Sequence, residues 1–329
     1  MRHRNLGKTG IQVSEIGLGG LFVSSFGSTN RSEAVRAVRR GLELGINYID
    51  TAPGYQDSEE VMGQALEDVV QPYIISTKLG GRPHPFDPLD KEQLRRSVET
   101  SLKLLQKSTI DILMIHEPDR PGQYDWFTNW ENFHGPVCEL LTELKSEGIV
   151  RYTGLGGTTA YTLPAIMSTG TYDVVLTAFN YSLLWQEALS MIIPEAIKQN
   201  MGIIVGSPLQ QGALAECYTD QIENGAPWLS PSRRAQFKDL YTLVADLKIT
   251  LPELAIRWVI TNPSISTVLS GARSVDEIEQ NVDYVKAGSL PKTVMDRIQQ
   301  IADQVPFRPF EEPFCLPFRR PYRGPGPAF

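Results

Sequence analysis

The chain has 329 residues and a formal net charge of −7 at pH 7, with 41% hydrophobic and 21% charged residues. These proportions are ordinary for a globular protein in water, and the acidic balance argues against nucleic acid or anionic membranes as partners. No apolar run approaches the ~18 residues that a membrane-spanning helix needs, and the opening MRHRNLGKTG lacks the apolar segment of a secretory signal. We therefore expect a cytoplasmic protein, built as two average domains or as one α/β barrel.

Short apolar runs bounded by turn residues alternate with amphipathic stretches along most of the chain. Eight runs are typical of buried parallel strands, at residues 15–18, 46–50, 73–78, 111–116, 152–155, 174–178, 202–207 and 266–269. Helical patterns lie between them at 33–44, 89–105, 138–147 and 188–199, and one helical face is marked by Leu94, Val98, Leu102 and Leu105. The alternation predicts an α/β fold of the (β/α)8 TIM barrel type. A doubly wound sheet is the alternative, although it rarely needs eight such units.

The two ends of the chain depart from this alternation. Residues 4–13 hold GKTG between two short extended runs and predict an N-terminal hairpin that caps the barrel floor. Residues 305–329 are rich in proline and phenylalanine, which excludes a long helix and favours extended chain. We therefore divide the chain into a barrel at 1–304 and a C-terminal arm at 305–329. We expect the arm to pack over its own barrel or a partner subunit of a homo-oligomer, because its aromatic rings would otherwise be exposed to water.

The cysteines and histidines give no sign of a metal site. Cys138, Cys217 and Cys315 are scattered without CxxC spacing and predict free thiols in a reducing compartment. The four histidines show neither H-x3-H nor HExxH spacing. We therefore expect no metal and no disulfide frame.

Four polar residues fall at or just after the predicted ends of early strands: Asp50, Tyr55, Lys78 and His116. Barrel enzymes keep their chemistry at the C-terminal ends of the strands. Tyr55 would donate a proton to a carbonyl oxygen, Lys78 would lower the pKa of Tyr55, and His116 would orient the carbonyl. Lys78 needs a counter-ion at the end of a buried strand, and Asp50 on the neighbouring strand is the evident one.

Other interpretations of these residues remain. A rim tyrosine, a structural ion pair and a satisfied core histidine would explain them singly, but not in this order along successive strand ends. Glu117 and Asp119 could instead suggest glycoside hydrolysis, which needs a further acid across the pocket and leaves Tyr55 and Lys78 without a role.

With these four residues in this order, the chain resembles the aldo-keto reductase superfamily over residues 1–303, from GKTGIQVSEIGLGG to GARSVDEIEQNV. The resemblance implies an NAD(P)-dependent oxidoreductase that interconverts an alcohol and the carbonyl of an aldehyde, ketone or sugar, since no side chain supplies a hydride. The stretches HEPDRP and NYSLL look closer to the aldose-dehydrogenase-like members. The alternative is a non-catalytic, nicotinamide-nucleotide-binding regulatory subunit, a role that some relatives play and that an intact set of four residues argues against.

In the resembling family the cofactor lies extended across the top of the barrel. The resemblance implies that these residues bind it: Gly20, Leu21, Asp50, Gly157, Asn180, Ser207, Pro208, Leu209, Gln210, Gly212, Gly271, Ala272, Arg273, Glu277, Gln280 and Asn281. Ser270 and Gly271 are expected to open a helix whose N-terminal amides face a phosphate. The family's habit favours NADP, whose 2′-phosphate Arg273 would meet, but Glu277 would repel phosphate and accept from a ribose hydroxyl. The choice between NADP and NAD stays open.

The substrate site is expected in the insertion WFTNWENFHG that follows HEPD. Trp126 and Trp130 would wall the pocket of a small carbonyl compound or sugar, because aromatic planes bind both. Four positions depart from the family's pattern at the nicotinamide: Gly156-Gly157 replace Ser-Asn, Gly206 replaces an aromatic residue and Ala178 replaces a glutamine.

Overall fold

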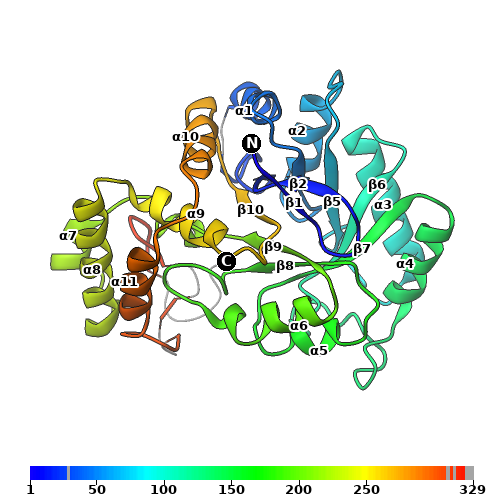
Figure 1. The fold of residues 1–329 in the computed structure, drawn as a ribbon. Helices are drawn as coiled ribbons and strands as arrows, with labels where there is room; N and C mark the ends of the chain where they lie inside the picture. The colour runs from blue at the N-terminus through cyan, green and yellow to red at the C-terminus, as the bar shows by residue number, and fades with distance from the viewer. Residues whose placement is uncertain (28–29, 309–311, 314–315, 323–329) are drawn as a thin grey trace.

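The computed structural model describes residues 1–27, 30–308, 312–313 and 316–322, and its centre is a closed barrel of eight parallel strands (Figure 1). The strands follow one another around the barrel in chain order, and the last pairs with the first. They are β3 (Ile16–Gly19), β4 (Tyr48–Asp50), β5 (Ile74–Leu79), β6 (Ile110–His116), β7 (Val150–Gly157), β8 (Val174–Ala178), β9 (Gly202–Gly206) and β10 (Thr267–Ser270). All eight predicted strands are present, so the predicted (β/α)8 barrel is confirmed.

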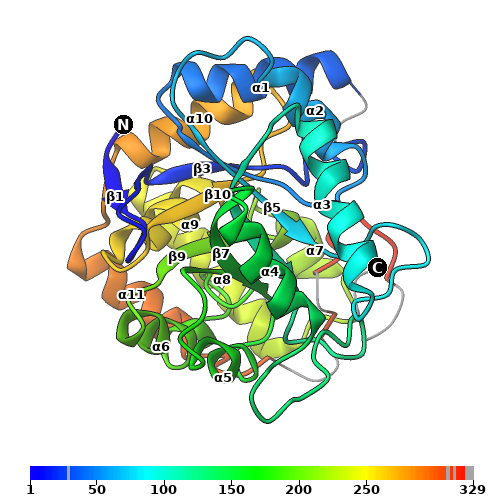
Figure 2. The same ribbon diagram turned by 90° about the vertical axis from the view of Figure 1, so that its right-hand side faces the viewer.

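Helices surround the barrel (Figure 2) and bury the outer faces of its strands. They are α1 (Arg31–Glu43), α2 (Ser58–Ala65), α3 (Lys91–Leu105), α4 (Pro136–Ser146), α5 (Leu163–Met167), α6 (Ile192–Lys198), α7 (Thr219–Asn224), α8 (Pro231–Leu247), α9 (Leu251–Thr261), α10 (Val275–Lys286) and α11 (Lys292–Ala302). Two short 3-10 turns are η1 (Glu187–Leu189) and η2 (Gln210–Gly212). The helix predicted at 188–199 is therefore divided into η1 and α6. Pro194 explains the break, because its ring lacks an N–H and would clash with a helical carbonyl at Ser190.

Helix α3 shows how the sequence pattern becomes structure. Asp90 caps it by accepting hydrogen bonds from the backbone N–H groups of Glu92 and Gln93. Of the predicted apolar face, Leu94, Val98 and Leu105 are buried against the barrel, and Leu102 is half-buried.

The N-terminal hairpin consists of β1 (His3–Asn5) and β2 (Gln12–Ser14), paired antiparallel. Leu6 and Val13 are fully buried and belong to one apolar cluster with Tyr48 and other residues that fill the barrel interior. Gly7 allows this close docking, because it has a φ of +52° and a Cβ there would lie 2.2 Å from the backbone nitrogen of Gly202. The hairpin therefore closes the floor of the barrel, as predicted.

The described parts of the C-terminal arm pack against α8 and the loop before α7. Arg233 Nε of α8 donates to Glu312 Oε2 at 3.0 Å, and their side chains are 0% and 2% exposed. Phe318 is buried and stacks on Tyr218 with the ring centroids 4.6 Å apart. Cys315 lies outside the described residues.

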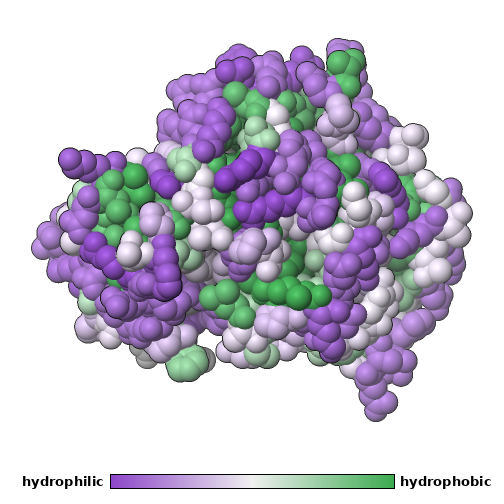
Figure 3. Space-filling model, viewed as in Figure 1, coloured by the Kyte–Doolittle hydropathy of each residue, from purple (hydrophilic) through white to green (hydrophobic). Residues whose placement is uncertain are grey.

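The surface seen in Figure 3 is mostly hydrophilic, with hydrophobic residues in several separate patches. Among the described residues, no helix has the length and apolar character that crossing a membrane requires. The same residues contain no cluster of three or more His, Cys, Asp or Glu side chains that could hold a metal ion. Cys138 and Cys217 are free thiols.

Candidate active site

Asp50 and Lys78 form a buried ion pair at the C-terminal ends of β4 and β5. The parallel register places Asp50 opposite Ser76, and Lys78 points to the same side of β5 because side chains alternate along a strand. Lys78 Nζ donates to Asp50 Oδ2 at 2.7 Å and to the carbonyl of Thr51 at 2.8 Å, while Ser76 Oγ donates to Asp50 Oδ1 at 2.8 Å. Each carboxylate oxygen of Asp50 therefore accepts a hydrogen bond from a neighbouring side chain, and the ammonium of Lys78 has two oxygen partners.

Tyr55 lies in the turn between β4 and α2, held by a hydrogen bond from its N–H to the carbonyl of Ala52 at 3.1 Å. Its ring centroid lies 4.9 Å from Lys78 Nζ. The ring also meets His116, at the end of β6, edge to face with a centroid distance of 5.6 Å and an interplanar angle of 81°. The structure thus brings the four predicted catalytic residues together.

Burial and charge shift the pKa of three of these groups. Burial alone would lower the pKa of Lys78, but the interactions with Asp50 and Tyr55 together outweigh it and the pKa is raised. Burial, together with the nearby positive charges of Lys78 and Arg120, lowers the pKa of His116 to about 3. Burial raises the pKa of Tyr55 above 10.0, and the ammonium of Lys78 offsets only part of this rise. The sequence led us to expect a lowered pKa for Tyr55, and the net direction is the opposite because the phenolate would be desolvated.

This arrangement can protonate an oxygen placed between Tyr55 and His116. At neutral pH Tyr55 keeps its proton and His116 is a neutral imidazole, so each can donate a hydrogen bond to one acceptor. The permanent ammonium of Lys78 stabilises the phenolate left by proton transfer.

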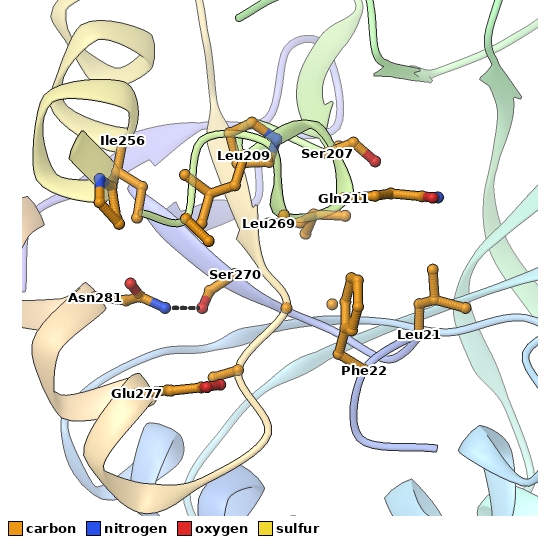
Figure 4. A pocket seen from close by; sticks show the side chains of 18 of the residues that line it. Leu21, Phe22, Ser207, Leu209, Gln211, Ile256, Leu269, Ser270, Glu277 and Asn281 are labelled. Atoms are coloured by element: carbon orange, nitrogen blue, oxygen red, sulfur yellow. Dashed lines mark hydrogen bonds between the residues drawn. The ribbon is translucent and has the colours of Figure 1, made fainter. Parts of the chain in front are cut away.

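A cavity of about 530 Å³ extends from Asp50 and Tyr55 across the top of the barrel to α10. Figure 4 shows the side chains near Ser270, Glu277 and Asn281 that line it. Thirteen of the residues expected to bind the cofactor line it: Gly20, Leu21, Asp50, Ser207, Pro208, Leu209, Gly212, Gly271, Ala272, Arg273, Glu277, Gln280 and Asn281. The volume lies within the ~300–1,000 Å³ typical of pockets for cofactors and small ligands. Asn281 Nδ2 donates to Ser270 Oγ at 2.7 Å, which fixes the loop after β10 against α10.

The other three expected cofactor residues do not line this cavity. Gln210 is 1% exposed, and its amide donates to the carbonyl of Phe179 and the hydroxyl of Ser182. Asn180 is buried beside Thr177, 3.4 Å from its hydroxyl. Gly157 lies at the end of β7, where a Cβ would meet Leu163 at 2.6 Å.

The N-terminus of α10 differs from the expectation that Ser270 and Gly271 open the helix. Helix α10 begins at Val275, after the cap Ser274. The N–H of Val275 donates to Glu33 Oε1 at 3.1 Å, and the N–H of Glu277 donates to Ser274 Oγ at 3.3 Å. These two amides are therefore already engaged by side chains of the protein.

Arg273 and Glu277, the two residues expected to decide the choice of cofactor, are paired with each other. Arg273 Nη2 lies 2.7 Å from Glu277 Oε1, and the backbone N–H of Arg273 donates to Glu277 Oε2 at 2.7 Å. The carboxylate thus holds both the guanidinium and the loop at the rim of the cavity.

Neither of the two tryptophans expected to wall the substrate pocket is among the residues that line this cavity. Trp126 is fully buried, and its Nε1 donates to the carbonyl of His116 at 3.1 Å. Trp130 packs edge to face on Phe127 and donates to Asp125 Oδ1 at 2.9 Å. Trp126 therefore supports the strand end that carries His116.

From the sequence, Glu117 and Asp119 next to His116 were considered only as possible acids of a glycoside hydrolase. Arg120 Nη1 lies 3.0 Å from Glu117 Oε1, and the side chains are 29% and 14% exposed. Asp119 instead accepts from the backbone N–H of Thr158 at 2.9 Å, so it holds the loop after β7. Glu117 is therefore paired with a charged side chain beside His116, whereas Asp119 is bound to backbone amide groups.

Several residues that line the cavity were missed from the sequence. Phe22 and Tyr218 come from loops, Gln211 from η2 and Arg320 from the arm, and no periodic pattern marks a functional side chain in these segments. The substituted positions Ala178 and Gly206 also line the cavity, and their small size leaves its floor open.

Comparison with known proteins agrees with this geometry. A model of the aldo/keto reductase family matches residues 15–303. The chain is 32% identical over 292 residues to L-galactose dehydrogenase of Arabidopsis thaliana, covering 86% of this chain and 87% of the relative. It is 28% identical to the NADH-specific methylglyoxal reductase of Escherichia coli strain K12, covering 86% and 93%.

A solved structure has the same architecture. It is the holo form of an aldo-keto reductase from Bacillus halodurans, with a TM-score of 0.75 and 26% identity over 94% of this chain and 98% of that chain. The family match spans the whole barrel and includes Asp50, Tyr55, Lys78 and His116. This chain therefore belongs to the aldo/keto reductase family.

Proposed function

We propose that this protein is an NAD(P)-dependent oxidoreductase that interconverts a carbonyl compound and its alcohol, with Tyr55 as the general acid and base. The proposal depends on one observation, which is that the Tyr55 ring lies beside both Lys78 and His116 at the cavity. The ring centroid of Tyr55 is 4.9 Å from Lys78 Nζ and 5.6 Å from the ring centroid of His116. The cavity joins the catalytic end to polar groups on α10 and so fits an extended dinucleotide. A bound nicotinamide would supply the hydride.

The side chains divide the remaining work. In reduction, His116 donates an N–H hydrogen bond to the carbonyl oxygen, and Tyr55 transfers its phenolic proton to that oxygen as negative charge develops. Lys78 stabilises the phenolate, and Asp50 holds the ammonium in place through the 2.7 Å contact. In oxidation, the phenolate of Tyr55 accepts the proton of the alcohol. Because the pKa of Tyr55 is raised, reduction is favoured near neutral pH and oxidation at higher pH.

For the cofactor we propose a preference for NAD(H). The family's habit favoured NADP, but the pairing of Arg273 with Glu277 at 2.7 Å occupies the guanidinium that a 2′-phosphate would need. Glu277 also brings a carboxylate to the cavity, which repels a phosphate dianion and accepts a hydrogen bond from a ribose hydroxyl. The relative from Escherichia coli is named as NADH-specific, which supports the same preference.

For the substrate we propose a small, hydroxylated carbonyl compound such as an aldose. The Glu117–Arg120 pair lies directly after His116 and offers both acceptors and donors to hydroxyl groups at the rim of the site. The name of the plant relative, L-galactose dehydrogenase, points to the same class of compound.

A panel of aldehydes, ketones and sugars, each with NADH, NADPH, NAD⁺ and NADP⁺, tests these proposals through the absorbance of the reduced ring. We expect turnover with hydroxylated carbonyls or aldoses, a larger kcat/KM with NAD(H), and loss of turnover in Tyr55→Phe. Retained binding of a dinucleotide without turnover on any compound would favour the non-catalytic regulatory subunit instead.

A further inference from the structure

The C-terminal arm holds one residue, Arg320, at the cavity. The preceding Phe318 is 4% exposed and stacks on Tyr218 with an interplanar angle of 7°. The N–H of Arg319 donates to Gln221 Oε1 at 3.0 Å, and its guanidinium lies 2.6 Å from Glu216. The backbone before Arg320 is therefore fixed by a buried ring, a hydrogen bond and an ion pair.

The side chain of Arg320 turns toward the loop after β9. Arg320 Nη2 donates to the carbonyl of Gln211 at 3.2 Å, and the residue lines the same cavity as Tyr55. The backbone of Gly212, next to Gln211, has a φ of +110°, a conformation that favours glycine. The contact brings a cation to the wall of the cavity.

The barrel topology shows which part of the cavity this is. The cavity leaves the catalytic end at Tyr55 and passes over the end of β10 to Glu277 on α10. In the barrel β10 lies between β3 and β9. The loop after β3, with Leu21, and the loop after β9, with Gln211, therefore flank the passage on its two sides (Figure 4). Arg320 stands on the β9 side of the passage, between the two ends of the cavity.

A dinucleotide with its nicotinamide at Tyr55 and its adenosine near α10 has its diphosphate in this passage. Among the described residues that line the cavity, the cations are Arg273 and Arg320. Arg273 is paired with Glu277 at 2.7 Å, and Glu216 is paired with Arg319. The hydrogen bond described for Arg320 goes to a neutral carbonyl, which leaves its charge and other N–H groups available to a phosphate.

We propose that Arg320 binds the diphosphate of the nicotinamide dinucleotide, so that the C-terminal arm forms one wall of the cofactor site. The proposal rests on the dinucleotide-dependent function proposed above. A guanidinium suits this role because its planar N–H groups donate to two phosphate oxygens at once and its charge persists at any working pH. The diphosphate is common to NAD and NADP, so this contact adds affinity for both.

Fluorescence titrations with NADH and NADPH test the proposal on the full chain, without any substrate. Arg320→Gln should raise the Kd of both cofactors by about tenfold, and Arg320→Lys should restore part of the affinity. Arg297→Gln is the matched control: this arginine pairs with Asp246 on the surface at 3.1 Å, away from the cavity, and its loss should leave both Kd values unchanged. The same series with ADP-ribose, followed by calorimetry, should show the same loss, because this probe keeps the diphosphate and lacks the nicotinamide.

The outcomes are distinct. Equal affinity of wild type and Arg320→Gln for NADH overturns the role of Arg320 and leaves the proposed function standing. Weakening of NADPH alone would assign Arg320 to the 2′-phosphate and overturn the diphosphate contact, and equal weakening by the glutamine and lysine variants would show that charge is not the cause. A wild-type protein that binds neither cofactor contradicts the proposed function together with this inference.

Discussion

Replacing Lys78 by methionine separates the structural and the catalytic roles of the buried pair. The ammonium is 1% exposed and its partner Asp50 is 3% exposed. The substitution removes the 2.7 Å contact to Asp50 and the 2.8 Å contact to the carbonyl of Thr51, while Ser76 still donates to the other carboxylate oxygen. Breaking a buried ion pair from one side costs about 3–5 kcal/mol, so we expect a clearly lower free energy of unfolding.

The double variant Asp50→Asn with Lys78→Met supplies the control. It leaves no charge behind, so its free energy of unfolding should recover part of the loss seen in Lys78→Met. Its activity should stay absent, because Tyr55 still lacks the ammonium that stabilises its phenolate. Urea unfolding of the wild type, both single variants and the double variant gives the coupling free energy, and carbonyl reduction is assayed separately on the folded proteins.

Two results would refute this reasoning. If Lys78→Met unfolds at the urea concentration of the wild type, the pair does not contribute to stability in the way its burial implies. If Lys78→Met reduces carbonyl compounds at the wild-type rate at neutral pH, Lys78 does not assist Tyr55.

Three further predictions concern the chemistry. Tyr55→Phe should lower kcat for reduction by about 10²–10⁴-fold, the usual effect of losing a general acid, while the Kd of NADH stays within a few-fold; a variant with substantial turnover would mean that another residue is the acid. Glu277→Gln should tighten NADPH binding by relieving repulsion and should slightly weaken NADH binding. If the guanidinium of Arg273 leaves Glu277 to bind the 2′-phosphate, Arg273→Ala should weaken NADPH binding by about tenfold. Titration of both variants with both cofactors shows which of the two residues sets the cofactor preference. Because the raised pKa of Tyr55 leaves little phenolate at neutral pH, the rate of alcohol oxidation should rise as pH increases toward that pKa. His116, with a pKa of about 3, should add no inflection to the pH–rate profile near neutrality. An oxidation rate independent of pH across the alkaline range would contradict the assignment of Tyr55 as the base.

The strands were predictable because a strand that is buried on both faces has a recognisable sequence pattern. Each barrel strand is a short apolar run between turn residues, such as Val174–Ala178, with four of five residues buried. The helices between β9 and β10 were not predicted, since α7, α8 and α9 follow one another without an intervening strand and the alternating pattern gave no reason for three. Helix α8 mixes buried Arg233 and Gln236 with its apolar residues, which weakens its periodicity.

The clustering of the candidate catalytic residues was predictable for a different reason than the positions of the residues around them. Strand ends in a parallel barrel meet at one rim, so chain order alone placed Asp50, Lys78 and His116 together. The position of Trp126 depended on how an insertion folds back, and its indole turned under His116 instead of into the cavity. Arg320 lies more than a hundred residues from Gln211, which it contacts at 3.2 Å, and no local pattern can report a contact of that separation.

The two cavity arginines connect cofactor choice to the arm. Arg273 lies within one i,i+4 ion pair with Glu277, so the charge available to a 2′-phosphate is set locally by α10. Arg320 comes from a separate segment and contacts the loop after β9, so the charge available to the diphosphate is set by how the arm packs. Substitutions at Glu277 should therefore change the ratio of the NADH and NADPH Kd values, whereas substitutions at Arg320 should raise both and leave their ratio near that of the wild type. A change of the ratio in Arg320→Gln would mean that the two arginines act on the same phosphate, and the separation of roles along the cavity would fail.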